Sequence, residues 1–155
     1  MRETILDRLK AMGIELSEPA KPVASYVGFV RQGDLVYVSG QLPFVDGRLS
    51  ATGLLGRDVS IEEGAAAARH CAINLINQVH AACEGDLERV TRCIRLGGFV
   101  ASTPDFTDHP KVINGASDLI GAVFGDKGAH ARAAVGVAAL PLNAAVEVEG
   151  LFAIR

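Results

Sequence analysis

HARAAVGVAALP at residues 130–141 and NAAVEVEGLFA at residues 143–153 predict two apolar strands near the C-terminus. Pro141 lacks the backbone N–H that a sheet needs, so it marks the break between them. Arg132 opens the first strand in small, apolar company. In the second strand Glu147 and Glu149 are two residues apart, which puts both side chains on one face. If the two strands pair or lie close, we expect the arginine to meet a carboxylate at one end of a sheet.

These charged positions allow two interpretations. In the first, the arginine and the glutamates pair with each other or face solvent, as charged side chains in strands usually do. In the second, Arg132 forms an anion site, because its planar guanidinium fits a carboxylate in bidentate fashion and stays charged at any working pH. A nearby glutamate would then position a water or move a proton. The local sequence leaves both interpretations open.

The composition bounds the fold and the partners. The chain of 155 residues has the length of a single domain, residues 1–155, with a real core. Its hydrophobic content of 49% comes largely from alanine, valine and leucine, and tryptophan is absent. We therefore expect tight packing of small side chains and apolar surface that is buried in an oligomer. The net charge of -3 and the lack of a basic block make a nucleic-acid partner an unfavourable hypothesis.

The sequence carries no targeting, metal or redox motif. No apolar run approaches the roughly 20 residues that span a bilayer, and the mixed charges of residues 1–8 differ from a signal peptide. The cysteines form no C-x-x-C pair, and the histidines have no H-x-x-x-H spacing. We therefore expect a cytoplasmic protein with buried free thiols, no membrane association, no metal and no cofactor.

Helical patterns occur at three places. Residues 4–12 carry apolar side chains at helical spacing and end at a glycine, which predicts a short helix lying on the body. SIEE, beginning at Ser60, is a capping box that starts a long helix, and that helix should end near residues 84–85. A second long helix is predicted at residues 112–124.

Strand patterns surround these helices. Residues 26–31 and 35–39 predict a hairpin around a turn at residues 32–34, and residues 91–100 predict a further strand. With the two C-terminal strands, this order predicts an α+β fold in which a mixed β-sheet has the two long helices packed on one face. The other face would be left for a partner subunit.

Three motifs carry a resemblance to a known family. They are SGQLP at residues 39–43, R-x-x-V-x-V-x-x-L-P at residues 132–141 and VEVE at residues 146–149. Together they resemble the Rid family of reactive imine and enamine deaminases, also called the YjgF or endoribonuclease L-PSP family, from about Tyr26 to the C-terminus. The resemblance implies a chorismate-mutase-like fold of the bacillus type, assembled as a homotrimer that binds ligands between subunits. The helix at about residues 3–12 looks like an addition, which is typical of a divergent branch.

The resemblance also assigns the chemistry. Arg132 matches the family's arginine that clamps the substrate carboxylate, and Glu147 matches the acid that helps to place the attacking water. The implied reaction is hydrolysis of a 2-imino or 2-enamino acid, such as 2-aminoacrylate, to a 2-keto acid and ammonia. It needs a positioned water, a route for protons and a cation that holds the carboxylate, without a cofactor.

Further positions match residues that bind the substrate in the family: Tyr26, Ser39, Gly40, Asn114 and Ala134. The last of these stands where the family often has a cysteine. The residue types alone also allow a purely structural role at some positions. Tyr26 fits an edge-strand aromatic, Ser39 fits a strand end that needs a hydrogen bond, and Glu149 fits a structural residue.

Two other functions stay open beside deamination. A non-catalytic trimer that binds a small metabolite would keep the fold and the anion site. A ribonuclease, which the family's older name suggests, would need a basic surface with interleaved aromatic side chains. The acidic balance of this chain argues against the ribonuclease.

Overall fold

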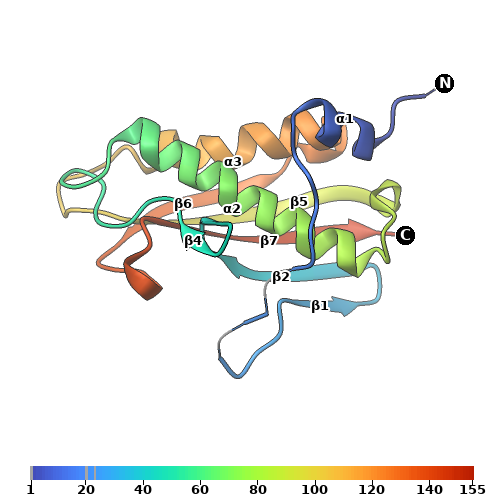
Figure 1. The fold of residues 1–155 in the computed structure, drawn as a ribbon, viewed down its shortest axis with the longest axis horizontal. Helices are drawn as coiled ribbons and strands as arrows, with labels where there is room; N and C mark the ends of the chain where they lie inside the picture. Colours follow the sequence, from blue (N-terminus) through green and yellow to red (C-terminus); the bar gives the residue numbers. More distant parts are fainter. Residues whose placement is uncertain (1, 20, 23) are drawn as a thin grey trace.

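The computed structural model describes residues 2–19, 21–22 and 24–155. Its centre is a five-stranded sheet with the order β1-β2-β7-β5-β6 (Figure 1). The strands are β1 (Phe29–Gln32), β2 (Leu35–Gln41), β5 (Val90–Ala101), β6 (Ala131–Val137) and β7 (Val146–Ile154), and β3 (Phe44–Val45) and β4 (Arg48–Leu49) form a separate ribbon. β5 and β6 run parallel, whereas the other neighbours in the large sheet run antiparallel. The sheet is therefore mixed, and the predicted β1–β2 hairpin is confirmed.

Two long helices, α2 (Ile61–Ala82) and α3 (His109–Phe124), lie side by side on one face of the sheet (Figure 1). α2 begins with the predicted capping box, in which Ser60 and Glu63 each accept a hydrogen bond from the other's N–H. α3 begins earlier than its apolar pattern predicts, because Pro110 in the first turn needs no N–H partner. The predicted α+β architecture with both long helices on one face is confirmed.

The two C-terminal strands do not pair in the described sheet, so the expected meeting of Arg132 with a carboxylate of the next strand is wrong within one chain. β5 lies between them and pairs with β6 on one side and β7 on the other. The chain leaves β5 through α3 and returns beside it as β6, because parallel neighbours need such a crossover. Short 3-10 helices lie at three connections: η1 (Leu87–Arg89), η2 (Gly125–Gly128) and η3 (Pro141–Asn143). The last of them is the predicted break after β6.

The core lies between the sheet and the two long helices. It includes the fully buried side chains of Leu75 and Ile76 from α2 and of Phe152 from β7. On the opposite face of the sheet, three large apolar side chains are about half exposed: Val30 (51%), Tyr37 (50%) and Val135 (46%). No helix of the described chain covers this face (Figure 1), so it stays open in a single copy.

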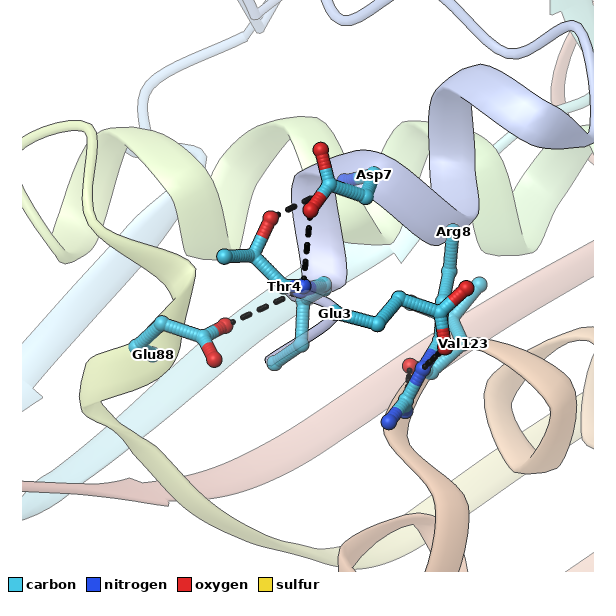
Figure 2. A network of polar contacts seen from close by, with 7 residues as sticks. Glu3, Thr4, Asp7, Arg8, Glu88 and Val123 are labelled. Atoms are coloured by element: carbon cyan, nitrogen blue, oxygen red, sulfur yellow. Dashed lines mark hydrogen bonds and ion pairs between the residues drawn. The ribbon is translucent and has the colours of Figure 1, made fainter. Parts of the chain in front are cut away.

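The helix predicted near the N-terminus is α1 (Ile5–Ala11), and Figure 2 shows its polar contacts. The Ile5 N–H donates to the Glu88 carboxylate at 3.1 Å, and the Arg8 guanidinium donates to the Val123 carbonyl at 2.9 Å. Its capping box is formed by Thr4 and Asp7. Glu88 precedes β5 and Val123 lies near the end of α3, so α1 is fastened to both elements.

α3 approaches α2 closely at Gly115, where an added Cβ would overlap the Ala65 carbonyl. We expect Gly115→Ala to lower the free energy of unfolding by about 1–3 kcal/mol, the usual cost of overpacking. Gly121→Ala in the same helix is the matched control, because an added Cβ there meets nothing within 4 Å. That control should be stabilised by about 0.5–1 kcal/mol, since glycine weakens a helix relative to alanine. Denaturant titration of both variants measures the difference, and equal stabilities would contradict the close approach.

Two further predictions can be compared with the fold. The three cysteines are buried and unpaired: Cys71, Cys83 and Cys93. No helix in the described part of the chain combines the length and the hydrophobicity that crossing a bilayer requires.

Candidate functional site

A cavity of about 440 Å³ lies between the end of β2, α2 and the segment before β1. Four of the predicted site residues line it: Tyr26, Ser39, Gly40 and Glu147. They come from parts of the chain that are distant in sequence, and we call them the cavity group. The volume is typical of a pocket for a small metabolite.

A β-bulge makes room for the Glu147 carboxylate at this cavity. The pairing of β2 with β7 shifts register between Val38 and Gln41, and an extra residue of this kind bends a strand. Gly40 lies in the bulge, where an added Cβ would overlap Glu147 Oε1. A side chain at this position would therefore displace the Glu147 carboxylate from where it lies.

The environment of Glu147 raises the pKa of its carboxyl. Burial is the main cause, and the negative charge of Glu149 on the same face of β7 adds to it. The ion pairs found in the described part of the chain do not involve Glu147. A carboxylate with a raised pKa and no ion-pair partner has the properties of a general base.

Ser39 has a structural partner as well as a place in the cavity wall. Its hydroxyl donates to the Val27 carbonyl at 2.7 Å, and its N–H donates to the Gly28 carbonyl at 2.9 Å. These bonds join the segment just before β1 to β2. The strand itself begins at Phe29, so the predicted start at Tyr26 is wrong. Tyr26 lies in a bend ahead of the strand and is 54% exposed at the cavity.

Arg132 points toward α3. Its Nη1 donates to Asn114 Oδ1 at 2.8 Å and to the Ser117 hydroxyl at 3.1 Å, and its Nη2 makes a longer contact of 3.4 Å with the Pro110 carbonyl. All three partners are uncharged groups of α3. The ion pairs of the described residues do not include Arg132. The guanidinium is therefore oriented but not neutralised.

Ala134 lies on the same face of β6 as Arg132 and packs partly buried against the core. The structure thus brings Arg132, Asn114 and Ala134 together near the edge strand, and we call them the arginine group. No residue of the arginine group lines the cavity described above.

The side chains of Arg132 and Glu147 leave the sheet on opposite faces. Arg132 is opposite Leu96 of β5, and Glu147 is opposite Phe99 of the same strand. Strand spacing and rise place their Cα atoms about 14 Å apart. Leu96 is fully buried beneath the helices, and a residue three positions on in a strand points to the other face. One small ligand therefore cannot contact both side chains of a single chain.

The charges of the two groups are complementary. The charged residues of the cavity wall are three acids and one lysine: Glu18, Asp46, Glu147 and Lys21. By itself this wall repels a carboxylate ligand, whereas the arginine group offers a cation without a counter-charge. The two halves would make a complete site for a carboxylate if two copies of the chain brought them together.

Neither a metal cluster nor an accessible thiol accompanies the cavity. No group of three or more metal-ligating side chains occurs among the described residues. Burial, together with the nearby charge of Glu147, raises the pKa of the Cys71 thiol well above its ordinary value. Burial also raises the pKa of Cys93 to about 12. Both thiols are therefore poor nucleophiles.

The sequence interpretation missed two polar neighbours of Arg132. Ser117 contacts its guanidinium, and His130 Nε2 lies 2.9 Å from the Ser117 hydroxyl. Asn114 and Ser117 are three residues apart, which places them on one helix face. That spacing is a signal by which Ser117 is recognisable from the sequence once Asn114 is chosen.

Two asparagines of α2 in the cavity wall were also missed. The Asn74 amide donates to the carbonyls of Leu42 and Phe44, and Asn77 Oδ1 accepts from the Ser17 N–H at 3.0 Å. Their i, i+3 spacing, with the polar Gln78 on the same helix face, was the available signal. Through these bonds α2 holds the loops that form the cavity.

The chain matches a family model and a known protein over most of its length. The family model described as "YjgF/chorismate_mutase-like, putative endoribonuclease" matches residues 6–154. Protein TCP17 of Trypanosoma cruzi is 51% identical over 144 residues, which cover 92% of this chain and 89% of that protein.

Two solved structures are similar in both sequence and fold. The protein Atu1372 of Agrobacterium tumefaciens is 50% identical with a TM-score of 0.92, and the match covers 97% of this chain and 92% of that one. A protein of Shewanella oneidensis MR-1, described as "a putative endoribonuclease", is 36% identical with a TM-score of 0.94, over 98% of this chain and 100% of that one. The chain therefore belongs to the YjgF family, which is also called the Rid or endoribonuclease L-PSP family.

Proposed function

We propose that this protein hydrolyses reactive 2-imino and 2-enamino acids, such as 2-aminoacrylate, to 2-keto acids and ammonia. Two copies of the chain complete the site: Arg132 of one copy holds the substrate carboxylate over the cavity of the next, where Glu147 directs the water. Membership of the YjgF family supports a role with small molecules or an endoribonuclease-like role. The acidic cavity favours the first of these, because RNA is a polyanion.

The proposal rests on one observation: Arg132 and Glu147 lie apart within one chain, and neither has an ion-pair partner among the described residues. Arg132 is held by neutral acceptors of α3 and has no ion pair among the described residues. Glu147 stands at a small cavity with its pKa raised by burial. A 2-imino acid presents an anion and an electrophilic carbon side by side, and it therefore needs a cation and a base that face each other across one small site.

The chemistry requires proton transfer at Glu147. The water oxygen forms a bond to C2 of the protonated imine, the C=N electron pair moves to nitrogen, and Glu147 accepts a proton from the water. The C–N bond breaks when this proton passes to nitrogen, and the hydroxyl at C2 loses its proton to the departing ammonia as the keto group forms. An enamine substrate first gains a proton at its terminal carbon and becomes the imine.

The open face of the sheet supports an assembly of copies. Val30 and Tyr37 are cross-strand neighbours on this face and each is about half exposed, and a second copy of the chain would bury these apolar side chains. We extend the proposal to a closed homotrimer, in which every interface joins the arginine group of one copy to the cavity group of the next. Light scattering on the purified protein should give the mass of three chains.

The proposal is tested by adding the wild-type protein to 2-aminoacrylate that is generated in the assay. We expect faster release of pyruvate and ammonium than in buffer alone, in proportion to the concentration of protein. If a folded trimer leaves the rate at the buffer value, deamination of this substrate is excluded. Calorimetry with 2-oxobutanoate then tests the remaining alternative, a non-catalytic binder of small carboxylates.

The raised pKa of Glu147 leads to a prediction about pH. Glu147 must be ionised to accept a proton, and the negative charge of Glu149 opposes that ionisation. Glu149→Gln should therefore move the acidic limb of the kcat/KM profile to lower pH. The limb should stay above the position expected for an ordinary glutamate, because burial, the larger cause, remains.

The measurement is the pH dependence of pyruvate release by the wild type and by Glu149→Gln. Glu62→Gln is the control, because Glu62 is an exposed acid in the first turn of α2 and should leave the limb in place. A limb that does not move in Glu149→Gln would exclude Glu147 as the group that titrates.

A further inference from the structure

His130 lies two residues before Arg132, and its imidazole ring has a partner at each nitrogen. Nδ1 is 2.6 Å from the Gly128 carbonyl, and Nε2 is 2.9 Å from the Ser117 hydroxyl. A carbonyl oxygen only accepts hydrogen bonds, so Nδ1 carries the proton. In the neutral ring Nε2 is then an acceptor. With the neutral ring, the Ser117 hydroxyl donates to His130.

Ser117 connects this ring to the guanidinium. Its hydroxyl has a single proton, and His130 takes it, so the oxygen lone pairs face the Arg132 Nη1 group at 3.1 Å. The bonds run in one direction, from Arg132 to Ser117, from Ser117 to His130 and from His130 to the Gly128 carbonyl. Such a chain has one consistent arrangement of protons, and it holds its members in place.

This series of hydrogen bonds determines which edge of the guanidinium remains free to bind a ligand. Nη1 has two protons, and Asn114 Oδ1 and the Ser117 hydroxyl accept them. Nη2 makes one long contact of 3.4 Å with the Pro110 carbonyl. No acceptor for Nε is found among the described residues. The edge formed by Nε and Nη2 therefore keeps its capacity to donate hydrogen bonds, and such an edge binds a carboxylate through two parallel hydrogen bonds.

We propose that Ser117 and His130 are positioning residues, which hold the Nε–Nη2 edge of Arg132 toward the substrate carboxylate. This inference rests on the proposed function of Arg132 as the carboxylate clamp. Asn114 alone leaves the second Nη1 proton without an acceptor, so the guanidinium can turn and lose one of its two bonds to the ligand. Since the carboxylate is held equally before and during the chemistry, the loss should appear in KM.

The first test is the steady-state kinetics of Ser117→Ala and Ser117→Thr with 2-aminoacrylate. We expect Ser117→Ala to raise KM about 5- to 20-fold with kcat within about two-fold, the pattern of a lost uniform binding interaction. Ser117→Thr keeps the hydroxyl and should restore KM to within about two-fold of the wild type. His130→Phe should resemble Ser117→Ala. Because both act through one chain of hydrogen bonds, the double variant should be no worse than either single variant.

A matched control comes from a second serine–histidine pair. Ser102 Oγ lies 3.1 Å from His109 Nε2, and this pair has no hydrogen bond to Arg132. Ser102→Ala removes the same kind of bond and should leave KM unchanged. The positioning role is wrong if Ser117→Ala and Ser117→Thr raise KM alike, or if Ser117→Ala lowers kcat with KM unchanged.

The second test does not depend on turnover. We expect the nitrogen NMR spectrum of the wild type to show His130 as the Nδ1–H tautomer. The Kd for 2-oxobutanoate, measured by calorimetry, should rise about 5- to 20-fold in Ser117→Ala and stay near the wild-type value in Ser117→Thr. If the wild type binds 2-oxobutanoate in this way without hydrolysing imines, the proposed deamination fails and the positioning role stands. If imines are hydrolysed and Ser117→Ala binds and turns over like the wild type, only the positioning role fails.

Discussion

Arg132→Ala is expected to lower kcat/KM for 2-aminoacrylate by about 100-fold, because a bidentate, charge-assisted pair contributes about 1.5–3 kcal/mol. The acids in the cavity wall, Glu18, Asp46 and Glu147, make the loss larger, since the substrate carboxylate would then face negative charge without a counter-cation. Initial rates of pyruvate release, corrected for hydrolysis in buffer, measure the effect.

A second variant at this position separates charge from geometry, and a variant elsewhere serves as the control. Arg132→Lys keeps the positive charge but loses the planar fork, and we expect a loss of about ten-fold, between the alanine variant and the wild type. Arg2→Ala removes an exposed arginine near the N-terminus and should behave like the wild type. If Arg132→Ala is folded and trimeric yet retains wild-type kcat/KM, the assignment of the carboxylate clamp is wrong.

Mixing two inactive variants is expected to restore activity, which is the second large effect. Arg132→Ala chains lack the clamp and Glu147→Gln chains lack the base, but the first supply an intact cavity group and the second an intact arginine group. In trimers assembled at random from equal amounts of both, about a quarter of the interfaces combine the two intact halves. Activity should therefore rise to about a quarter of the wild-type value per site after co-expression or joint refolding.

The control for mixing is Arg132→Ala combined with the double variant Arg132→Ala/Glu147→Gln. No interface in that mixture contains an intact Arg132, so its activity should stay at the background. If the mixture of the two single variants is no more active than its separate components, although light scattering shows trimers that contain both, then the site does not join two copies. That result would overturn the assembly of the site and leave the fold unaffected.

The local elements were predictable because their causes are local. The capping box at Ser60 fixes the start of α2 within a few residues. The alternation in VEVE places Glu147 and Glu149 on the face opposite the buried Val146 and Val148. The start of α3 was misplaced, because its first turn is polar and contains Pro110, which hides the helical pattern.

The candidate site was only partly predictable, because it depends on contacts between residues that are distant in the sequence. The motifs around Ser39, Arg132 and Glu147 mark the positions in the sequence, and the structure gathers Ser39 and Glu147 at one cavity. The bond from Ser117 to His130 joins residues of two different elements. The spacing from Asn114 marks Ser117 only as a residue on the same helix face, and nothing in the sequence marks His130 as its partner before the helix is docked on the sheet.

The sequence by itself determined the order of strands and helices, their apolar faces and the types of charged residue available, because periodicity, caps and turn residues act over a few neighbouring positions. Only the tertiary structure decided that β5 lies between the last two strands and that Arg132 and Glu147 leave the sheet on opposite faces. Strand order is set by which surfaces can be buried together and by the crossover that a parallel pair requires. These are long-range properties. They separate two charged residues of consecutive strands into the halves of a site that, in our proposal, two copies of the chain share.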